Sequence, residues 1–181
     1  MNSMHEHTHG QEHAGHVDTS AIRRSFRDFI PLVVIFGVIA LFTIMQSMRA
    51  GAWETAYLMR NFMGAFFIVF GGFKIIRWKG FVDAYQIYDI VAKRSRVYGY
   101  TYPIIELGLG FSYLFSFQLA LVQVITIAIM CIGAIGVGQE LVKKNTIPCA
   151  CLGVVFKIPM TKVTFFEDIL MAAMAAGMFF V

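Results

Sequence analysis

The chain has 181 residues, of which 58% are hydrophobic and only 14% are charged, and its formal net charge is +4. With a mean hydropathy of +0.68, this composition excludes an ordinary soluble domain, which rarely carries so little charge. The basic excess does not indicate nucleic-acid binding, because the basic residues flank long apolar segments, as they do in membrane proteins.

The chain begins with a polar segment that holds every histidine of the sequence: His5, His7, His9, His13 and His16. This segment has too little apolar surface to form a core, so we expect residues 1–28 to be a disordered, histidine-rich tail and not a secretory signal peptide. Clustered imidazoles are ligands for Zn and Cu. Two interpretations stay open, a tail that handles metal and a tail that is merely polar.

Long apolar segments dominate the rest of the chain. A helix needs about 20 apolar residues to cross the hydrocarbon core of a membrane, and five segments approach this length: 29–48, 56–76, 101–117, 119–138 and 164–181. The last is the shortest in apolar residues. The sequence therefore predicts an all-α integral membrane bundle, in which residues 29–48 add one N-terminal transmembrane helix to a four-helix core over 56–181.

The connection between the second and third segments has its own pattern. Between Gly80 and Arg96, apolar and aromatic residues recur at helical spacing and polar residues take the other faces. This pattern predicts an amphipathic helix that lies in the membrane interface, anchored by its aromatic side chains. The alternative is that the aromatic face packs on the protein.

Glu106 is the most conspicuous ionisable residue inside the predicted membrane segments. Pro103 suits the first turn of a helix, which would place Glu106 about one turn in, near the positive end of the helix dipole. Lys74 ends the preceding segment on the same side of the membrane and could pair with Glu106. We favour this structural pairing over a proton or ion role, although intramembrane carboxylates are candidates for function.

The segment Pro148–Gly153 presents two cysteines, Cys149 and Cys151, separated only by Ala150. Such a pair can form a strained disulfide, or its thiolates can bind one soft metal ion such as Cu or Zn. A third cysteine, Cys131, lies within an apolar segment, where packing is the favoured interpretation. The last segment has a capping-box pattern, Thr164 followed by Glu167, at its expected start.

The basic residues indicate which side faces the cytoplasm. In a five-helix arrangement, thirteen of the fifteen Lys and Arg residues fall on the side of the tail and the cysteine pair, and only Arg49 and Arg60 fall on the other. By the positive-inside rule, the crowded side is cytoplasmic. Four crossings separate the tail from Cys149, so both are expected in the same compartment.

Three stretches, in this order, resemble the DoxX-like membrane proteins and more closely their methylamine-utilisation branch, MauE. The stretches are Phe66-x4-Gly71-Gly72-Phe73-Lys74, Gly80-Phe81-x3-Tyr85-x2-Tyr88 and Pro103-x2-Glu106-x-Gly108-x-Gly110. The cysteine pair resembles a Cys-Gly-Cys-Phe-Gly-like motif of that branch, with Ala150 and Leu152 in place of Gly and Phe. The resemblance implies a four-helix membrane core and an accessory role in thiol–disulfide chemistry, which in the namesake system supports maturation of a periplasmic amine dehydrogenase.

Two functional hypotheses follow. In the first, Cys149 and Cys151 cycle between dithiol and disulfide with a thioredoxin-like partner. In the second, the tail histidines capture Cu or Zn and pass it to the cysteines, with a metal chaperone as the partner. A scaffold with reduced cysteines is a third reading. None of these identifies an enzyme, and each describes a multi-pass protein in contact with membrane lipid, expected in a bacterial inner membrane.

Overall fold

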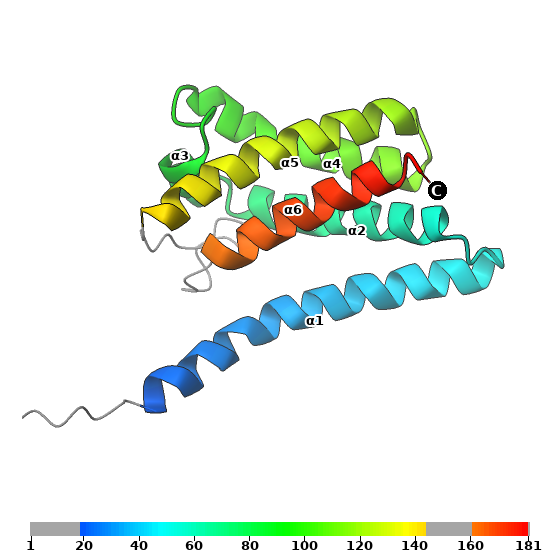
Figure 1. Ribbon diagram of the computed structural model, residues 1–181, viewed down its shortest axis with the longest axis horizontal. Helices are drawn as coiled ribbons and strands as arrows, with labels where there is room; N and C mark the ends of the chain where they lie inside the picture. Colours follow the sequence, from blue (N-terminus) through cyan, green and yellow to red (C-terminus); the bar gives the residue numbers. More distant parts are fainter. Residues whose placement is uncertain (1–18, 144–160, 181) are drawn as a thin grey trace, which may run out of the picture.

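The computed structural model describes residues 19–143 and 161–180, and within these residues it is all helical. Figure 1 shows helices α1 to α6 lying roughly along one axis, with the short α3 at one end. Their bounds are α1 Thr19–Ala50, α2 Thr55–Ile76, α3 Trp78–Tyr88, α4 Arg96–Leu114, α5 Leu119–Val142 and α6 Thr161–Gly177. The all-α prediction is confirmed for the described residues.

Helix α1 stands apart from a compact group formed by the other helices. It packs mainly on α2, whereas α2 pairs closely with α4, and α5 with α6 (Figure 1). The helix begins at Thr19, ten residues before the predicted start at Phe29. Residues 19–28, which composition assigned to the tail, are therefore helical, because nothing in Thr19–Asp28 interrupts a helix before Pro31.

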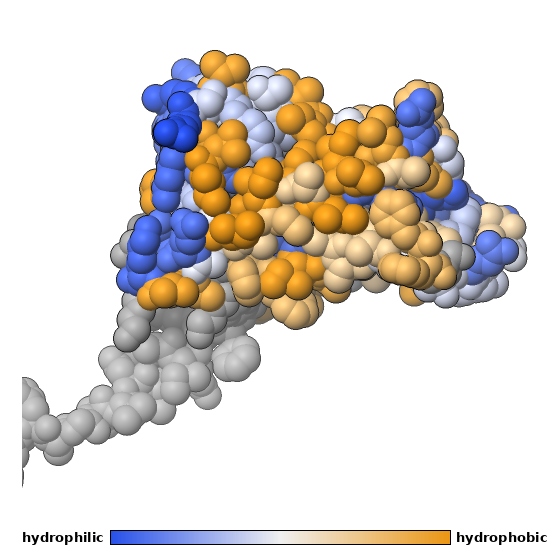
Figure 2. Space-filling model, turned by 45° about the horizontal axis from the view of Figure 1, so that its top comes forward, coloured by the Kyte–Doolittle hydropathy of each residue, from blue (hydrophilic) through white to orange (hydrophobic). Residues whose placement is uncertain are grey.

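Three helices are long and apolar enough to cross a membrane: Ile30–Ala50, Thr55–Ile76 and Leu119–Val142. Figure 2 shows an apolar band across the middle of the visible face and polar residues at both ends. Large apolar side chains on these helices are exposed, among them Val33, Val38 and Leu121. Apolar exposure on this scale needs lipid to cover it. The protein is therefore a multi-pass membrane protein, although α4 and α6 are not among the candidate spans.

Small residues bring α2 and α4 into close contact. A Cβ atom on Gly110 would lie 3.0 Å from the carbonyl oxygen of Gly64 and 3.0 Å from the amide nitrogen of Ile68. Both neighbours are backbone atoms, so the two helices can approach this closely only without a side chain at Gly110. This contact fixes the position of α4, which carries Glu106, against α2, which carries Lys74.

The aromatic face of α3 packs on the protein. Phe81, Tyr85 and Tyr88 are 1%, 3% and 7% exposed. Of the two arrangements expected from the sequence, these rings therefore pack on the protein and do not anchor the helix in lipid. The helix ends at Tyr88, well before the predicted Arg96, because the buried Asp89 turns the chain. Asp89 Oδ1 accepts hydrogen bonds from the backbone amides of Val91 and Ala92 at 2.9 and 2.7 Å.

Candidate functional site

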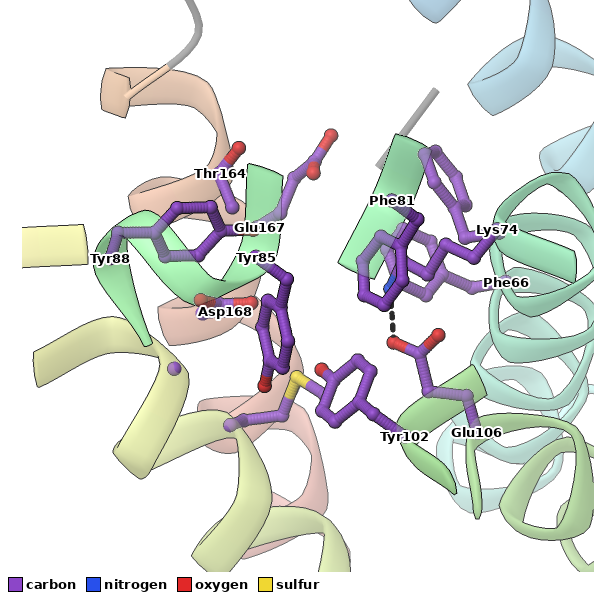
Figure 3. A pocket seen from close by; sticks show the side chains of 13 residues that line it. Phe66, Lys74, Phe81, Tyr85, Tyr88, Tyr102, Glu106, Thr164, Glu167 and Asp168 are labelled. Atoms are coloured by element: carbon purple, nitrogen blue, oxygen red, sulfur yellow. Dashed lines mark hydrogen bonds and ion pairs between the residues drawn. The ribbon is translucent and has the colours of Figure 1, made fainter. Parts of the chain in front are cut away.

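The described helices α2 to α6 enclose a polar cavity, here called the interior pocket. Figure 3 shows the Lys74 and Glu106 side chains on one side of it and Glu167 and Asp168 on the other, with Tyr85 between them. Apart from these charged groups and Thr164, its walls are aromatic side chains together with Met130 and Gly133. The full lining is Phe66, Phe70, Lys74, Phe81, Tyr85, Tyr88, Tyr102, Glu106, Met130, Gly133, Thr164, Glu167 and Asp168.

Lys74 and Glu106 form a buried ion pair in the pocket. Lys74 Nζ donates a hydrogen bond to Glu106 Oε1, and the two side chains are 9% and 2% exposed. The pairing expected from the sequence is therefore present. Glu106 lies deeper in its helix than the sequence predicts, because α4 begins at Arg96 and not near Thr101. Glu106 lies ten residues into α4, nearly three turns from the start, so the helix dipole does not explain its burial.

Aromatic rings complete the surroundings of the Lys74 ammonium. Its Nζ lies 4.9 Å from the ring centroid of Tyr102 and 5.5 Å from that of Phe81. At such distances the negative face of a ring attracts a cation. The ion pair and the two rings together surround the Lys74 side chain in a site from which bulk water is largely excluded.

Helix α6 adds two carboxylates that face the ion pair. It begins at Thr161, so Thr164 lies inside the helix and the predicted capping box is wrong. Glu167 is 5% exposed and lines the pocket instead of capping the helix. Asp168 beside it comes so close to α5 that a Cβ atom on Gly133 would lie 2.9 Å from Asp168 Oδ2.

Sequence reasoning did not identify the α6 carboxylates as part of a site. The capping-box pattern predicts a helix-cap role for Glu167 and says nothing about Asp168. The available signal was an adjacent Glu-Asp pair at the start of a segment that is otherwise apolar up to its end. Such a pair is costly to place in a membrane protein without a function or a partner.

Tyr85 connects the pocket to the turn that follows α3. Burial raises the pKa of Tyr85 well above its usual value, so the phenol stays protonated and can donate. Its hydroxyl donates to Asp89 Oδ2 at 2.9 Å. Asp89 thus binds both the turn and the pocket wall, and the position of Tyr85 depends on it.

The interior pocket is small. The space that water can occupy at its centre has a volume of about 30 Å³, and a water molecule needs roughly 10–15 Å³ of such space. The cavity therefore has room for water and not for an organic substrate. Two carboxylate oxygens within it, Glu106 Oε2 and Glu167 Oε1, are buried and accept no hydrogen bond from the described residues.

Basic residues gather at the end of the protein that holds α3. Glu140, near the end of α5, accepts hydrogen bonds from Lys93 and Lys143 at 3.0 and 3.1 Å. The start of α1, the end of α5 and the start of α6 lie toward this same end (Figure 1). The helix ends that border the tail and the cysteine segment therefore lie at one end of the protein.

The sequence-predicted thiol and imidazole ligands fall outside the described residues. These are Cys149, Cys151, His5, His7, His9, His13 and His16. Within 19–143 and 161–180, no group of three His, Cys, Asp or Glu side chains is arranged to hold a metal ion. Cys131 is described and lies on an exposed face of α5, so the expectation that it packs in the core is wrong.

Comparisons with known proteins identify a family. The family model described as methylamine utilisation protein MauE matches residues 52–181, which include all the helices except α1 and also both paired cysteines. No curated protein and no solved structure matches the chain. Because the family model covers well over half of the sequence, the chain belongs to the MauE family.

Proposed function

We propose that this MauE-family protein is a thiol-redox accessory or maturation factor of the membrane, in which Cys149 and Cys151 are the reacting groups. The observation that carries the proposal is the family match, which runs through the helical bundle and includes both cysteines. The two residues lie in the sequence between the end of α5 and the start of α6. The resemblance to DoxX-like membrane proteins implies the same accessory role in thiol–disulfide chemistry.

The chemistry would be thiol–disulfide exchange. A Cys149 or Cys151 thiolate attacks a disulfide of a thioredoxin-like partner and forms a mixed disulfide, which the second cysteine resolves. The pair loses two electrons and becomes a disulfide, and the partner disulfide becomes two thiols. Neighbouring Lys143, Lys144 and Lys157 would favour the thiolate form.

The test is a redox-state measurement on the full-length protein in cells. Free thiols are alkylated before extraction, and intact mass then counts the blocked cysteines before and after reduction. We expect the Cys149–Cys151 pair to switch between oxidised and reduced forms, and Cys131 to stay alkylated in both. Cys131→Ser is the matched control, because it removes a thiol on the exposed face of α5. A pair that remains reduced under oxidising growth contradicts the proposal.

The second candidate is a Cu- or Zn-handling membrane protein that uses the tail histidines and the cysteine pair. It is supported by the start of α1, the end of α5 and the start of α6, which lie toward the same end of the protein (Figure 1). The tail and the cysteine segment are thus attached to the same end. Metal analysis of the full-length protein and of a form lacking residues 1–18 tests it, and equal metal content in both would contradict a tail ligand set.

The distribution of basic residues between the two ends of the protein supports a proposed orientation in the membrane. Arg77, Lys79, Lys93, Arg94 and Lys143 belong to the end that holds α3, and Arg49 and Arg60 to the opposite end. By the positive-inside rule, the α3 end would face the cytoplasm of a bacterial cell. The cysteine pair would then exchange with a cytoplasmic partner.

A further inference from the structure

The interior pocket holds more negative than positive charge. Glu106, Glu167 and Asp168 bring three carboxylates, and Lys74 is the one basic side chain among the residues that line it. Lys74 is already committed to Glu106. The two carboxylates of α6 therefore have no ion-pair partner of their own among the described residues, and Glu167 is buried where an uncompensated charge is strongly disfavoured.

Among the described residues, the other elements that line the pocket around α6 supply no positive charge. From α3, Tyr85 and Tyr88 face the pocket, with Asp89 just beyond them; from α4 comes Tyr102 beside Glu106. The lining residues of α5, Met130 and Gly133, carry no charge. Among the described residues that line the pocket, every titratable group besides Lys74 and Glu167 is thus either a phenol or another carboxylate.

Two observations point to a ligand at this position. Glu167 is 5% exposed and Glu106 is 2% exposed, and each has one buried oxygen with no hydrogen-bond donor among the described residues. The adjoining cavity has room for water. The described residues include no set of ligands arranged for a metal ion, and the cavity is too small for an organic cation with its own hydration. A proton is the cation that fits.

We propose that the interior pocket is a proton-binding site, in which Glu167 and Asp168 share an exchangeable proton with cavity water while Lys74 neutralises Glu106. The proton comes from the solvent and binds to a carboxylate oxygen of Glu167 or Asp168. The resulting O–H group can then donate a hydrogen bond within the pocket, where two buried carboxylate oxygens have no donor among the described residues. Asp168 is only partly buried, so the described residues do not seal this side of the site completely. The proposal is independent of the cysteine chemistry, since it involves neither Cys149 nor Cys151.

Infrared spectroscopy of the full-length protein in lipid vesicles tests the proposal directly. At about pH 7, exposed Asp and Glu side chains are ionised, so a protonated carboxyl band reports a buried acid. We expect this band in the unmodified protein, with a shift in D2O that shows exchange with solvent. Its absence from the unmodified protein at this pH would overturn the proposal, whatever the variants do.

The variants assign the band to the pocket. Glu167→Gln and Asp168→Asn should each remove or displace it, whereas Asp83→Asn, which changes an exposed carboxylate on α3, should leave it unchanged. A band that survives in both pocket variants would contradict the assignment.

The spectra are repeated with sodium, potassium and choline as the only cation. Loss of the band in sodium or potassium alone would show that the site binds an inorganic cation and not a proton.

Discussion

Single residues hold the pocket together through buried polar contacts and not through apolar packing alone. The Lys74–Glu106 pair joins α2 to α4, and Asp89 joins the turn after α3 to Tyr85. Each contact removes a charge from water, so each is stable only while its partner is present. Substitutions that remove one partner should therefore cost more than substitutions that remove both.

The ion pair gives the first prediction. Lys74→Met leaves Glu106 as a buried carboxylate without its donor, and we expect a loss of roughly 3–5 kcal/mol in the free energy of unfolding. The double variant Lys74→Met/Glu106→Gln removes both charges and should recover much of this loss. Thermal unfolding in one detergent, monitored by circular dichroism, gives the comparison. A double variant that is less stable than Lys74→Met would contradict the pairing.

The second prediction concerns Asp89, which is 0% exposed and accepts three hydrogen bonds. Asp89→Ala leaves two backbone amides and the Tyr85 hydroxyl without an acceptor, and should lower the free energy of unfolding by roughly 2–4 kcal/mol. Asp83→Ala, on the exposed face of α3 just before this turn, is the matched control. Its pair with Arg96 is more than half exposed on both sides, so it should cost less than about 1 kcal/mol. Equal effects at both positions would disprove the role given to Asp89.

At the scale of helices, the pocket depends on how closely α2 and α4 approach. Gly64 and Gly110 face each other where the backbones meet, and the contact sets the register in which Lys74 reaches Glu106. Glycine in a helix is otherwise unfavourable, by about 1 kcal/mol relative to alanine. Its presence at Gly110 is therefore explained by the close packing and not by helix propensity.

The third prediction compares two glycines of α4. Gly110→Ala places a methyl group against backbone atoms of α2 and should cost roughly 1–3 kcal/mol, as overpacking does. Gly108→Ala points into open space, with no atom within 4 Å, and should be neutral or stabilising by up to about 1 kcal/mol. Unfolding of both variants is measured in the same detergent. Matching losses would show that the α2–α4 contact is less tight than described.

Helix bounds show why only part of the site was predictable from the sequence. Apolar length located α2 and α5 within a few residues, because membrane thickness constrains it. Local start signals misplaced α4 and α6, since Pro103 and Thr164 both suit a first turn but lie inside their helices. The Lys74–Glu106 pair was found because both residues are charged in apolar segments. The pocket position of Glu167 was missed because a capping box also explains a glutamate three residues after Thr164.

At the scale of the whole protein, its two ends differ in charge and its middle is apolar. The α3 end gathers most of the described basic residues, and Figure 2 shows polar ends on either side of an apolar band. This asymmetry is a property of the complete helix arrangement and not of any one loop. The pocket lies in the part of the bundle near the basic end, since α3, the end of α2 and the first two turns of α6 line it.

The orientation gives the last prediction, which two single-cysteine proteins can test. In a background without Cys131, Cys149 and Cys151, Asp83→Cys places a thiol on α3, and Glu54→Cys places one in the turn between α1 and α2, at the opposite end. Both positions are exposed. The positive-inside rule puts the α3 end in the cytoplasm. In spheroplasts, a membrane-impermeant maleimide should therefore label Glu54→Cys at once and Asp83→Cys only after permeabilisation. The reverse pattern would place the paired cysteines outside the cytoplasm, where they would meet periplasmic disulfides. Labelling of both positions before permeabilisation would show that the two ends are not on opposite sides of the membrane.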